Sequence, residues 1–397
     1  MLLLEREAQW ERLRRAWHRC AAGGTAIVLV EGAAGCGTTA LLRRLADHAA
    51  ERGALVLHAE GPRDVTGPGQ QPPAYGVLRR LLHASPAPDT APENFATAVR
   101  ALARHRPLLL CVDDLQDCDG PSLDHLTHLA RSLHRVPVLL ALGRAAGAGT
   151  AQAPAPDAEF LRHEAFDRIG VERLSPRATA VLAGRHHAGR GGDSDTAAPP
   201  LLAHRLYGLT GGNPLLCRAL LLEQPEQPVA PQATGDEPRG TDGARAAGEL
   251  RAAPGGPFLQ AVTACLRRSG APARRLTEAL AVLGPHANAE RAAEVTAGTA
   301  GAAAHVRDLL DAVGLTDGWR LRHPAVAAWA LEAVAPGELT ALGVRAARVL
   351  HAGGAGAGPT ARRLLHAYHH PYATPTPAPA SVSAPASASA SAPAPAS

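Results

Sequence analysis

Continuous apolar runs alternate with segments of helical periodicity over residues 5–144. The apolar runs are typical of strands buried on both faces, because a half-exposed strand would alternate polar and apolar side chains. The intervening segments repeat apolar residues every three or four positions, as amphipathic helices do. Predicted strands cover 26–31, 54–61, 106–119 and 136–144, and predicted helices cover 5–20, 38–52, 93–105 and 121–134. This alternation predicts the α/β class, with a parallel sheet covered by helices on both faces.

The pattern changes after about residue 145, where Ala, Gly and Pro become frequent. We therefore assign 1–150 to the α/β domain and 158–222 to a mainly helical segment. Residues 223–254 have little apolar content and are expected to be a disordered linker. Helical periodicity returns over 255–350, with a β-hairpin predicted at Asp317-Gly318, and a terminal helical segment covers 351–372. The Pro/Ala/Ser tail at 373–397 is expected to be disordered.

The stretch "VLVEGAAGCGTT" places a glycine-rich loop between a predicted strand and a predicted helix. Gly32, Gly37 and Thr39 fit the phosphate-loop pattern G-x-x-x-x-G-K-[ST], but Thr38 occupies the lysine position. The glycines, Gly35 included, allow backbone N–H groups to converge on phosphate oxygens at a helix N-terminus. Thr39 is predicted to supply a hydroxyl ligand to Mg²⁺. An ordinary tight turn is the alternative.

Polar residues end two of the predicted strands. Asp113 and Asp114 follow the apolar run of "LLLCVDDLQ", at the sheet edge where ligands bind in parallel sheets. Asp113 is predicted to hold Mg²⁺ through water, and Asp114 to polarise an attacking water or support the metal. Arg144 ends the next strand, which suits a sensor of a γ-phosphate. The alternatives are acids that cap the following loop and an arginine that is merely solvated.

Composition narrows the function classes only slightly. The 397-residue chain contains no lysine, and its net charge of +4 is spread along the sequence, so no block predicts binding to nucleic acid or membrane. The six cysteines form no C-x-x-C pair, so we expect buried thiols rather than a metal site. The N-terminus has neither a signal-peptide core nor a transmembrane stretch, and a cytoplasmic location is expected by default.

Five motifs follow one another along the chain: "LLLEREAQWERL", "GAAGCGTT", "LLLCVDDLQDCD", "LLALGR" and "LTGGNPLL". In this order they resemble the signal-transduction ATPases with numerous domains (STAND). They look most like the ATP-binding module of the large LuxR-type regulators of actinomycetes. The resemblance covers roughly residues 1–370 and implies an AAA/STAND-type P-loop NTPase domain, a helical lid over 158–222 and a winged-helix-like domain over 255–350. It also implies that ATP or ADP binds with Mg²⁺.

The resemblance implicates four residues of the helical part. In the family, the glycine–asparagine–proline turn of the lid approaches the nucleotide, which points to Gly212, Asn213 and Pro214 as binding residues. From the residues alone, this is a turn followed by a helix that begins near Pro214. The segment "GLTDGWRLRHPAVAAW" is similar to the family's winged-helix segment. In related switch proteins a histidine there contacts bound ADP, which points to His323, and a structural histidine is the alternative.

The sequence departs from the family pattern in three places. Thr38 replaces the lysine, and Glu5 stands where a glycine is expected. The regulators' helical-repeat arm and C-terminal helix-turn-helix have no counterpart here, so a truncated remnant is one interpretation. The missing lysine normally reaches the β- and γ-phosphates, and a hydrogen bond to a charged group contributes about 1.5–3 kcal/mol. We therefore expect nucleotide binding to be weaker by roughly ten- to a hundred-fold or more.

These observations predict an ATP-binding regulatory protein that acts as a nucleotide-responsive or pseudo-ATPase switch in transcriptional regulation, with weak or absent hydrolysis. We expect a protein partner or self-association. We expect neither direct binding to DNA nor association with a membrane. In a chain without lysine only an arginine can replace the lost charge, and Arg43 lies one turn beyond Thr39. The alternatives are an active ATPase with an unusual loop, and DNA binding through the winged-helix segment. The few basic residues over 290–330 disfavour the second.

Overall fold

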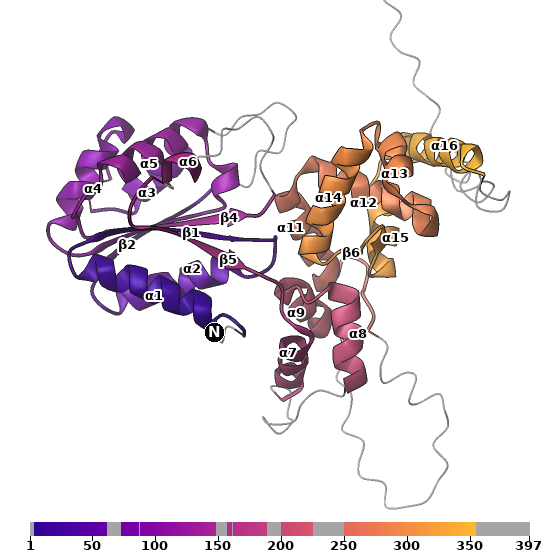
Figure 1. The fold of residues 1–397 in the computed structure, drawn as a ribbon, viewed down its shortest axis with the longest axis horizontal. Helices are drawn as coiled ribbons and strands as arrows, with labels where there is room; N and C mark the ends of the chain where they lie inside the picture. The colour runs from indigo at the N-terminus through magenta and orange to yellow at the C-terminus, as the bar shows by residue number, and fades with distance from the viewer. Residues whose placement is uncertain are drawn as a thin grey trace, which may run out of the picture. The chain divides into compact units, whose positions relative to one another are not determined.

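The computed structural model describes residues 4–61, 73–86, 88–147, 157–160, 162–188, 200–224 and 250–354 (Figure 1). It divides the chain into two compact units, 1–333 and 334–397. The predicted tail at 373–397, most of the predicted linker at 223–254 and most of the predicted segment at 351–372 lie outside the described residues.

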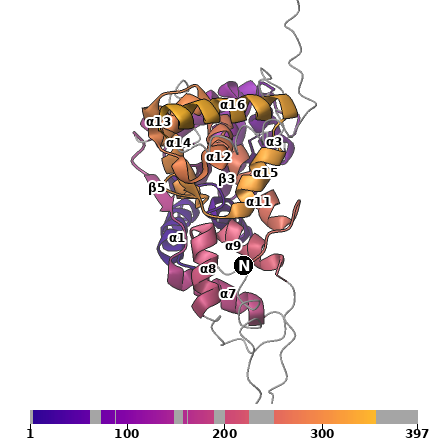
Figure 2. The same ribbon diagram turned by 90° about the vertical axis from the view of Figure 1, so that its right-hand side faces the viewer.

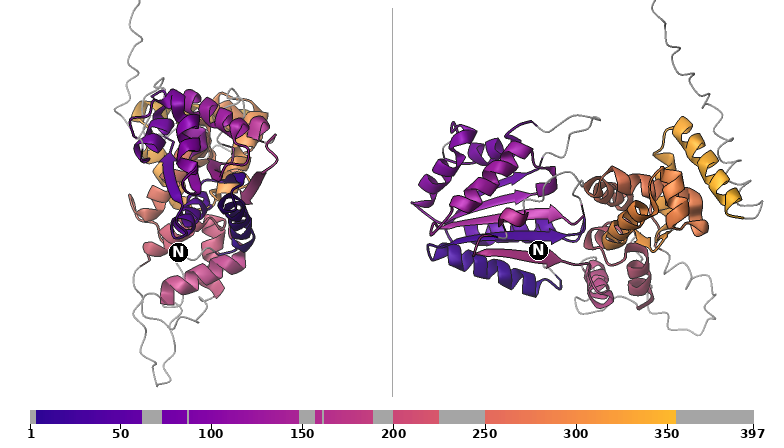
Figure 3. Two further views of the ribbon diagram at one scale, coloured as in Figure 1. Left: turned by 90° about the vertical axis from the view of Figure 1, so that its left-hand side faces the viewer. Right: turned by 45° about the horizontal axis from the view of Figure 1, so that its top comes forward.

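A five-stranded parallel sheet organises the first part of unit 1. Its strands are β1 (Thr25–Gly32), β2 (Leu55–Glu60), β3 (Leu108–Asp113), β4 (Val138–Ala145) and β5 (Phe166–Val171). Their order across the sheet is β2-β3-β4-β1-β5, and every neighbouring pair is parallel (Figure 3). The strands β1, β3 and β4 are buried almost throughout, which explains their continuous apolar sequences.

Helices cover both faces of this sheet (Figure 1). One face packs against α1 (Glu7–Ala21) and α2 (Thr38–Ala50), and the other against α3 (Gly76–His83), α4 (Phe95–Ala103), α5 (Gly120–Ser132) and α6 (Asp157–Phe160). Short 3₁₀ turns η1 (Pro92–Asn94) and η2 (Leu115–Asp117) precede α4 and follow β3. Helix α1 buries Leu13, Ala16, Trp17 and Cys20, the helical spacing that places one apolar face on the sheet. The predicted α/β class, with a parallel sheet covered on both faces, is confirmed.

The strand β5 differs from the sequence-based expectation. The stretch 158–222 is expected to be mainly helical, but Phe166–Val171 pairs with β1 at the edge of the sheet. Exposed Arg168 and Gly170 alternate with buried Ile169 and Val171, so one face of this edge strand is open to solvent. The sheet therefore continues beyond the predicted boundary at residue 150.

Helices make up most of the rest of unit 1. After β5 come α7 (Pro176–Ala188), α8 (Pro200–Thr210) and α9 (Pro214–Leu222). A second group contains α11 (Pro257–Ser269), α12 (Ala271–Leu283), the 3₁₀ turn η3 (Gly284–His286), α13 (Ala289–Thr296), α14 (Ala300–Val313), the hairpin strands β6 (Thr316–Asp317) and β7 (Arg320–Leu321), and α15 (Pro324–Glu332). Helix α12 contacts α11, α13, α14 and α15, so it is the central helix of this group (Figure 2). The β6–β7 pair is antiparallel, and because Asp317 pairs with Arg320, the turn consists of Gly318 and Trp319, one residue beyond the predicted Asp317-Gly318.

The described part of unit 2 is dominated by α16 (Pro336–Ala352). Its buried residues include Leu339, Leu342, Ala346 and Leu350, which form one stripe along the helix. None of the helices in the described ranges is long and apolar enough to cross a membrane.

Candidate functional site

The loop between β1 and α2 has the backbone that the glycine pattern predicts. Gly35 and Gly37 have φ angles of 85° and 107°, a conformation that residues with a side chain rarely adopt. Gly37 is the N-cap of α2, and no side chain caps the first N–H groups of this helix. These N–H groups therefore face the loop, where an anion would satisfy them. Thr38 and Thr39 are the first two residues of α2.

Asp113 lies at the C-terminal end of β3 and is 2% exposed. One carboxylate oxygen, Oδ1, accepts a hydrogen bond of 3.0 Å from the backbone N–H of Asp114. The other, Oδ2, is buried and has no partner among the described residues. Gly143 on β4 leaves room for this side chain, since a Cβ there would lie 2.4 Å from Asp113 Oδ1. A buried carboxylate oxygen without a donor favours a positively charged ligand.

A cavity of about 820 Å³ joins the loop, the ends of β3 and β4, and the helices α9 and α11. This volume is within the range of small-molecule and cofactor sites, about 300–1,000 Å³. Most residues predicted from the sequence line it: Gly32, Gly35, Gly37, Thr38, Thr39, Asp113, Asp114, Arg144 and Pro214. Gly212, Asn213 and His323 are not in the lining.

The cavity fits a magnesium–nucleotide complex by its donor set. Within the described ranges, no group of three or more His, Cys, Asp and Glu side chains could hold a metal by itself. Mg²⁺ does not need such a group, because it is usually held by one or two protein oxygens together with phosphate oxygens and water. In the lining, the Asp113 Oδ2 atom, which is buried without a partner among the described residues, and the hydroxyl of Thr39 could serve as such oxygens.

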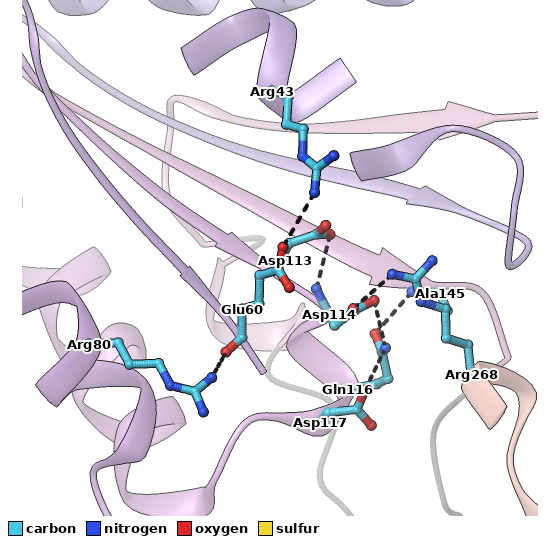
Figure 4. Close-up of polar contacts among 9 residues, drawn as sticks. All are labelled: Arg43, Glu60, Arg80, Asp113, Asp114, Gln116, Asp117, Ala145 and Arg268. Atoms are coloured by element: carbon cyan, nitrogen blue, oxygen red, sulfur yellow. Dashed lines mark hydrogen bonds and ion pairs between the residues drawn. The ribbon is translucent and has the colours of Figure 1, made fainter. Parts of the chain in front are cut away.

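Asp114 takes part in a network that reaches α11 (Figure 4). Its Oδ2 atom forms an ion pair of 3.0 Å with Arg268, and the two side chains are 6% and 24% exposed. Its Oδ1 atom accepts a hydrogen bond of 3.2 Å from Gln116. Gln116 in turn accepts a hydrogen bond of 3.0 Å from the backbone N–H of Ala145 at the end of β4. Asp114 is therefore held from both sides, in a left-handed conformation with a φ of 52°.

Arg144 is paired with a carboxylate of the neighbouring strand. The register places it opposite Glu31, whose Oε1 atom lies 2.8 Å from the Arg144 guanidinium. Glu31 also pairs with Arg168 of β5, so it joins the ends of three strands directly before the loop. To act as a phosphate sensor, Arg144 would have to leave Glu31 at least in part.

Asn213 binds the glycine loop rather than the cavity. Its Nδ2 atom donates hydrogen bonds of 2.8 Å to the carbonyl of Ala34 and 2.7 Å to that of Val313. Its Oδ1 atom caps α9 by accepting from the N–H groups of Leu215 and Leu216. Asn213 thus connects the loop, the start of α9 and the end of α14 in a fully buried position.

The rest of the glycine–asparagine–proline turn is set by close packing. Gly212 has a φ of 79°, and a Cβ there would lie 2.3 Å from the carbonyl oxygen of Leu174. Pro214 begins α9 and lines the cavity, as the resemblance implies. Close packing also restricts the glycine loop, because a Cβ on Gly35 would lie 2.7 Å from Asn213 Oδ1 and 3.1 Å from Cys265 Sγ.

His323 lies away from the cavity lining, at the N-terminus of α15. Its Nδ1 atom accepts a hydrogen bond of 3.1 Å from the N–H of Ala325, and its ring packs on Phe258 at 4.7 Å between centroids. Its Nε2 atom is buried without a partner among the described residues. Burial lowers the pKa of this imidazole.

Two residues near the N-terminus support the loop in ways that the sequence analysis did not assign. The buried guanidinium of Arg6 donates to the carbonyls of Cys36 in the loop and Glu172 after β5. Glu5 has a φ of 54°, in the left-handed region that favours glycine. Glu5 compensates through hydrogen bonds to Ser175, which lower the pKa of its carboxyl group. Both residues lie in the motif "EREAQ", which is the sequence feature from which they could have been identified.

The cysteines of the site are buried thiols. All six cysteines are free, and burial raises the pKa of Cys36 in the loop to about 11. The thiol of Cys265 on α11 donates to the carbonyl of Ala34 at 3.5 Å. These thiols contribute packing around the loop, since a protonated thiol is a poor nucleophile and metal ligand.

The sheet, the glycine loop and the acid-ended β3 define a P-loop NTPase-like fold. Residues 2–141 match the family described as "AAA ATPase domain", so the chain contains a domain of AAA type. A search of curated protein sequences finds no significant match.

Solved structures that are similar to this chain have low sequence identity to it. A STAND protein with a tetratricopeptide repeat sensor from Pyrococcus horikoshii has 15% identity and a TM-score of 0.35, with 89% of this chain and 47% of that chain covered. This chain thus spans less than half of that protein. Cdc6p from Pyrobaculum aerophilum has 14% identity, a TM-score of 0.42, and coverage of 83% and 85%. AMPPCP-bound DnaA from Aquifex aeolicus has 15% identity, a TM-score of 0.37, and coverage of 53% and 58%.

Proposed function

We propose that this chain binds ATP or ADP with Mg²⁺ in the cavity over the glycine loop and acts as a nucleotide-responsive switch, with weak or absent hydrolysis. The observation that carries the proposal is the buried Oδ2 atom of Asp113, which has no partner among the described residues and lies at the same cavity as the N-terminus of α2, which no described side chain caps. A carboxylate and free N–H groups at one cavity are complementary to a cation and an anion held together.

Each part of the site has a separate task in this proposal. The N–H groups of the loop and of the first turn of α2 bind phosphate oxygens, and Gly35 lets the loop pack against Asn213 and Cys265. Thr39 and Asp113 hold the magnesium ion, which would neutralise phosphate charge. Weak hydrolysis follows from Thr38, because an uncharged side chain does not stabilise charge that develops on the transferred phosphoryl group.

The switch role is supported by contacts between the loop and the helical part of the unit. The carbonyl of Ala34 accepts hydrogen bonds from Asn213 and from Cys265, and Arg268 pairs with Asp114. A ligand that moves the loop or Asp114 would therefore change the contacts of α9 and α11. We infer a regulatory protein of the LuxR/STAND kind, acting on transcription through a protein partner or self-association rather than through its own contact with DNA.

Equilibrium binding of ATP to the full chain, with and without Mg²⁺, tests the proposed site. We expect saturable binding that Mg²⁺ tightens, and we expect Asp113→Asn to remove most of the Mg²⁺ effect while ATP without metal binds as before. Asp124→Asn on α5, outside the cavity lining, is the matched control. The absence of saturable ATP binding would contradict the proposal, and so would an Mg²⁺ effect that Asp113→Asn leaves unchanged.

A further inference from the structure

Helix α9 begins at the glycine loop and carries one exposed arginine, Arg218, that lines the cavity. The N–H of Leu215 donates to the carbonyl of Gly35 at 3.3 Å, and Asn213 fixes the helix start on the loop. Pro214, Leu215 and Arg218 all line the cavity. Positions three and four apart share a helix face, so Arg218 lies on the face that contacts the loop.

The direction of the Arg218 side chain favours contact with a ligand over the loop. Arg218 is about 4.5 Å along the helix axis from Leu215, at 1.5 Å per residue. Long side chains in helices lean toward the N-terminus of the helix, which here is the end that contacts Gly35. The guanidinium can therefore extend back over the loop, toward the place where Thr38 leaves the site without a charge.

Arg218 is also the arginine of the lining that has no hydrogen bond or ion pair with another described residue. The other arginines of the lining each have a carboxylate, carbonyl or aromatic partner: Arg14, Arg43, Arg44, Arg52, Arg144 and Arg268. Arg43, the replacement considered from the sequence, is 67% exposed and lies 3.7 Å from Glu60 (Figure 4). Arg218 can bind a ligand without first breaking a contact.

We propose that Arg218 supplies, from α9, the phosphate-binding charge that Thr38 does not supply from the loop. This inference rests on the proposed nucleotide site and names a further binding residue in it. A guanidinium suits the role because its planar set of donors matches two phosphate oxygens at once. As a consequence, affinity depends on the phosphates of the nucleotide, and phosphate binding strengthens the contact of α9 with the loop.

The test compares dissociation constants of ATP, ADP and adenosine for the full chain and for Arg218→Gln. We expect Arg218→Gln to weaken ATP and ADP binding about tenfold or more, and to leave adenosine binding unchanged. Arg267→Gln on α11 is the matched control, because Arg267 is an exposed arginine outside the cavity lining. Arg218→Lys keeps the charge without the planar donors and is expected to lose less affinity than Arg218→Gln.

A second substitution tests whether a positive charge at residue 38 can replace the charge of Arg218 in binding ATP. With Thr38→Lys in place, we expect Arg218→Gln to cost much less ATP affinity than it costs in the natural chain, since the lysine then provides the charge. Equal losses in the two backgrounds overturn the proposal. Unchanged ATP affinity of Arg218→Gln, or equal losses for ATP and adenosine, also overturn it and leave the proposed function intact. A natural chain that binds none of the three ligands overturns both.

Discussion

Thr38 differs from a lysine in the one respect that matters most for a polyphosphate, because its side chain carries no charge. The rest of the loop keeps what phosphate binding requires, including the left-handed Gly35 and Gly37 and the uncapped start of α2. At the residue scale the site therefore retains its backbone donors and Asp113, and it lacks one cation in the loop itself.

Replacing Thr38 by lysine should restore that cation. We expect Thr38→Lys to tighten ATP binding of the Arg218→Gln chain by about ten- to a hundred-fold, as one charge-assisted contact of about 1.5–3 kcal/mol implies, and of the natural chain by less, because Arg218 already supplies a charge there. Titration calorimetry with ATP measures the change, and Thr38→Gln serves as an uncharged control of similar length. An affinity that Thr38→Lys does not alter in the Arg218→Gln chain would mean that the loop is not built around phosphate.

The residues of the loop and of β3 could be predicted because each lies in a short, self-contained sequence pattern. Asp113 and Thr39 are recognisable from their own neighbours. Arg268 and Arg218 are not, because their partners are decided by the tertiary fold. The Arg268–Asp114 pair joins positions 154 residues apart, and nothing near Arg268 in the sequence marks it as a site residue.

At the scale of elements, α11 and the end of β3 are coupled through a mostly buried ion pair. Removing one partner of such a pair leaves the other unpaired in a poorly solvated place. We expect Arg268→Gln to lower the free energy of unfolding by about 1–2 kcal/mol, a figure reduced for the partial exposure of Arg268. Urea unfolding followed by tryptophan fluorescence measures it, with Arg267→Gln as the control.

A double-mutant cycle with Asp114→Asn then separates the pair from its surroundings. The combined loss should be smaller than the sum of the two single losses, because the second substitution no longer leaves a charge unpaired. Strictly additive losses would show that Arg268 and Asp114 do not stabilise one another.

The elements themselves were predictable to different degrees. The strands β1, β3 and β4 are buried on both faces, so their sequences are continuous apolar runs that stand out from the helices. The strand β5 has the sequence "FDRIGV", in which charged residues of an exposed edge interrupt the pattern. Its place beside β1 depends on pairing that only the folded chain supplies.

At the scale of the whole molecule, the described part of unit 1 links the glycine loop to its last helices through buried contacts. Asn213 donates hydrogen bonds to the loop and to the end of α14. His323, at the N-terminus of α15, packs its ring on Phe258 of α11. Sequence periodicity predicted helices here but could not tell which of them pack together. That choice depends on side-chain shape and on contacts between distant segments.

Acid should weaken this helical part through His323. Burial lowers its pKa below that of a free imidazole, about 6.5, although nearby Glu223 acts in the opposite direction. At a pH above about 6.5 the imidazole is neutral in both the folded and the unfolded state. As the pH falls below about 6.5, the unfolded state binds the proton more readily than the folded state, so the free energy of unfolding decreases. The midpoint temperature of thermal unfolding should therefore be lower at pH 5.5 than at pH 7.5.

His323→Asn isolates this effect, since asparagine keeps an N-cap acceptor for α15 and does not titrate. We expect the thermal midpoint of the variant to fall less than that of the natural chain over the same pH range. An equal fall in both proteins would assign the acid sensitivity to other groups.

The central claim is that the site binds ATP and no longer turns it over efficiently. The most direct test is to incubate the full chain with radiolabelled ATP and Mg²⁺, isolate the complex and identify the nucleotide that remains bound. The account predicts that the label is recovered as ATP, with the same ADP fraction as in Asp113→Ala or in ATP alone. A chain that retains no label, or that releases ADP in steady turnovers abolished by Asp113→Ala, would contradict it.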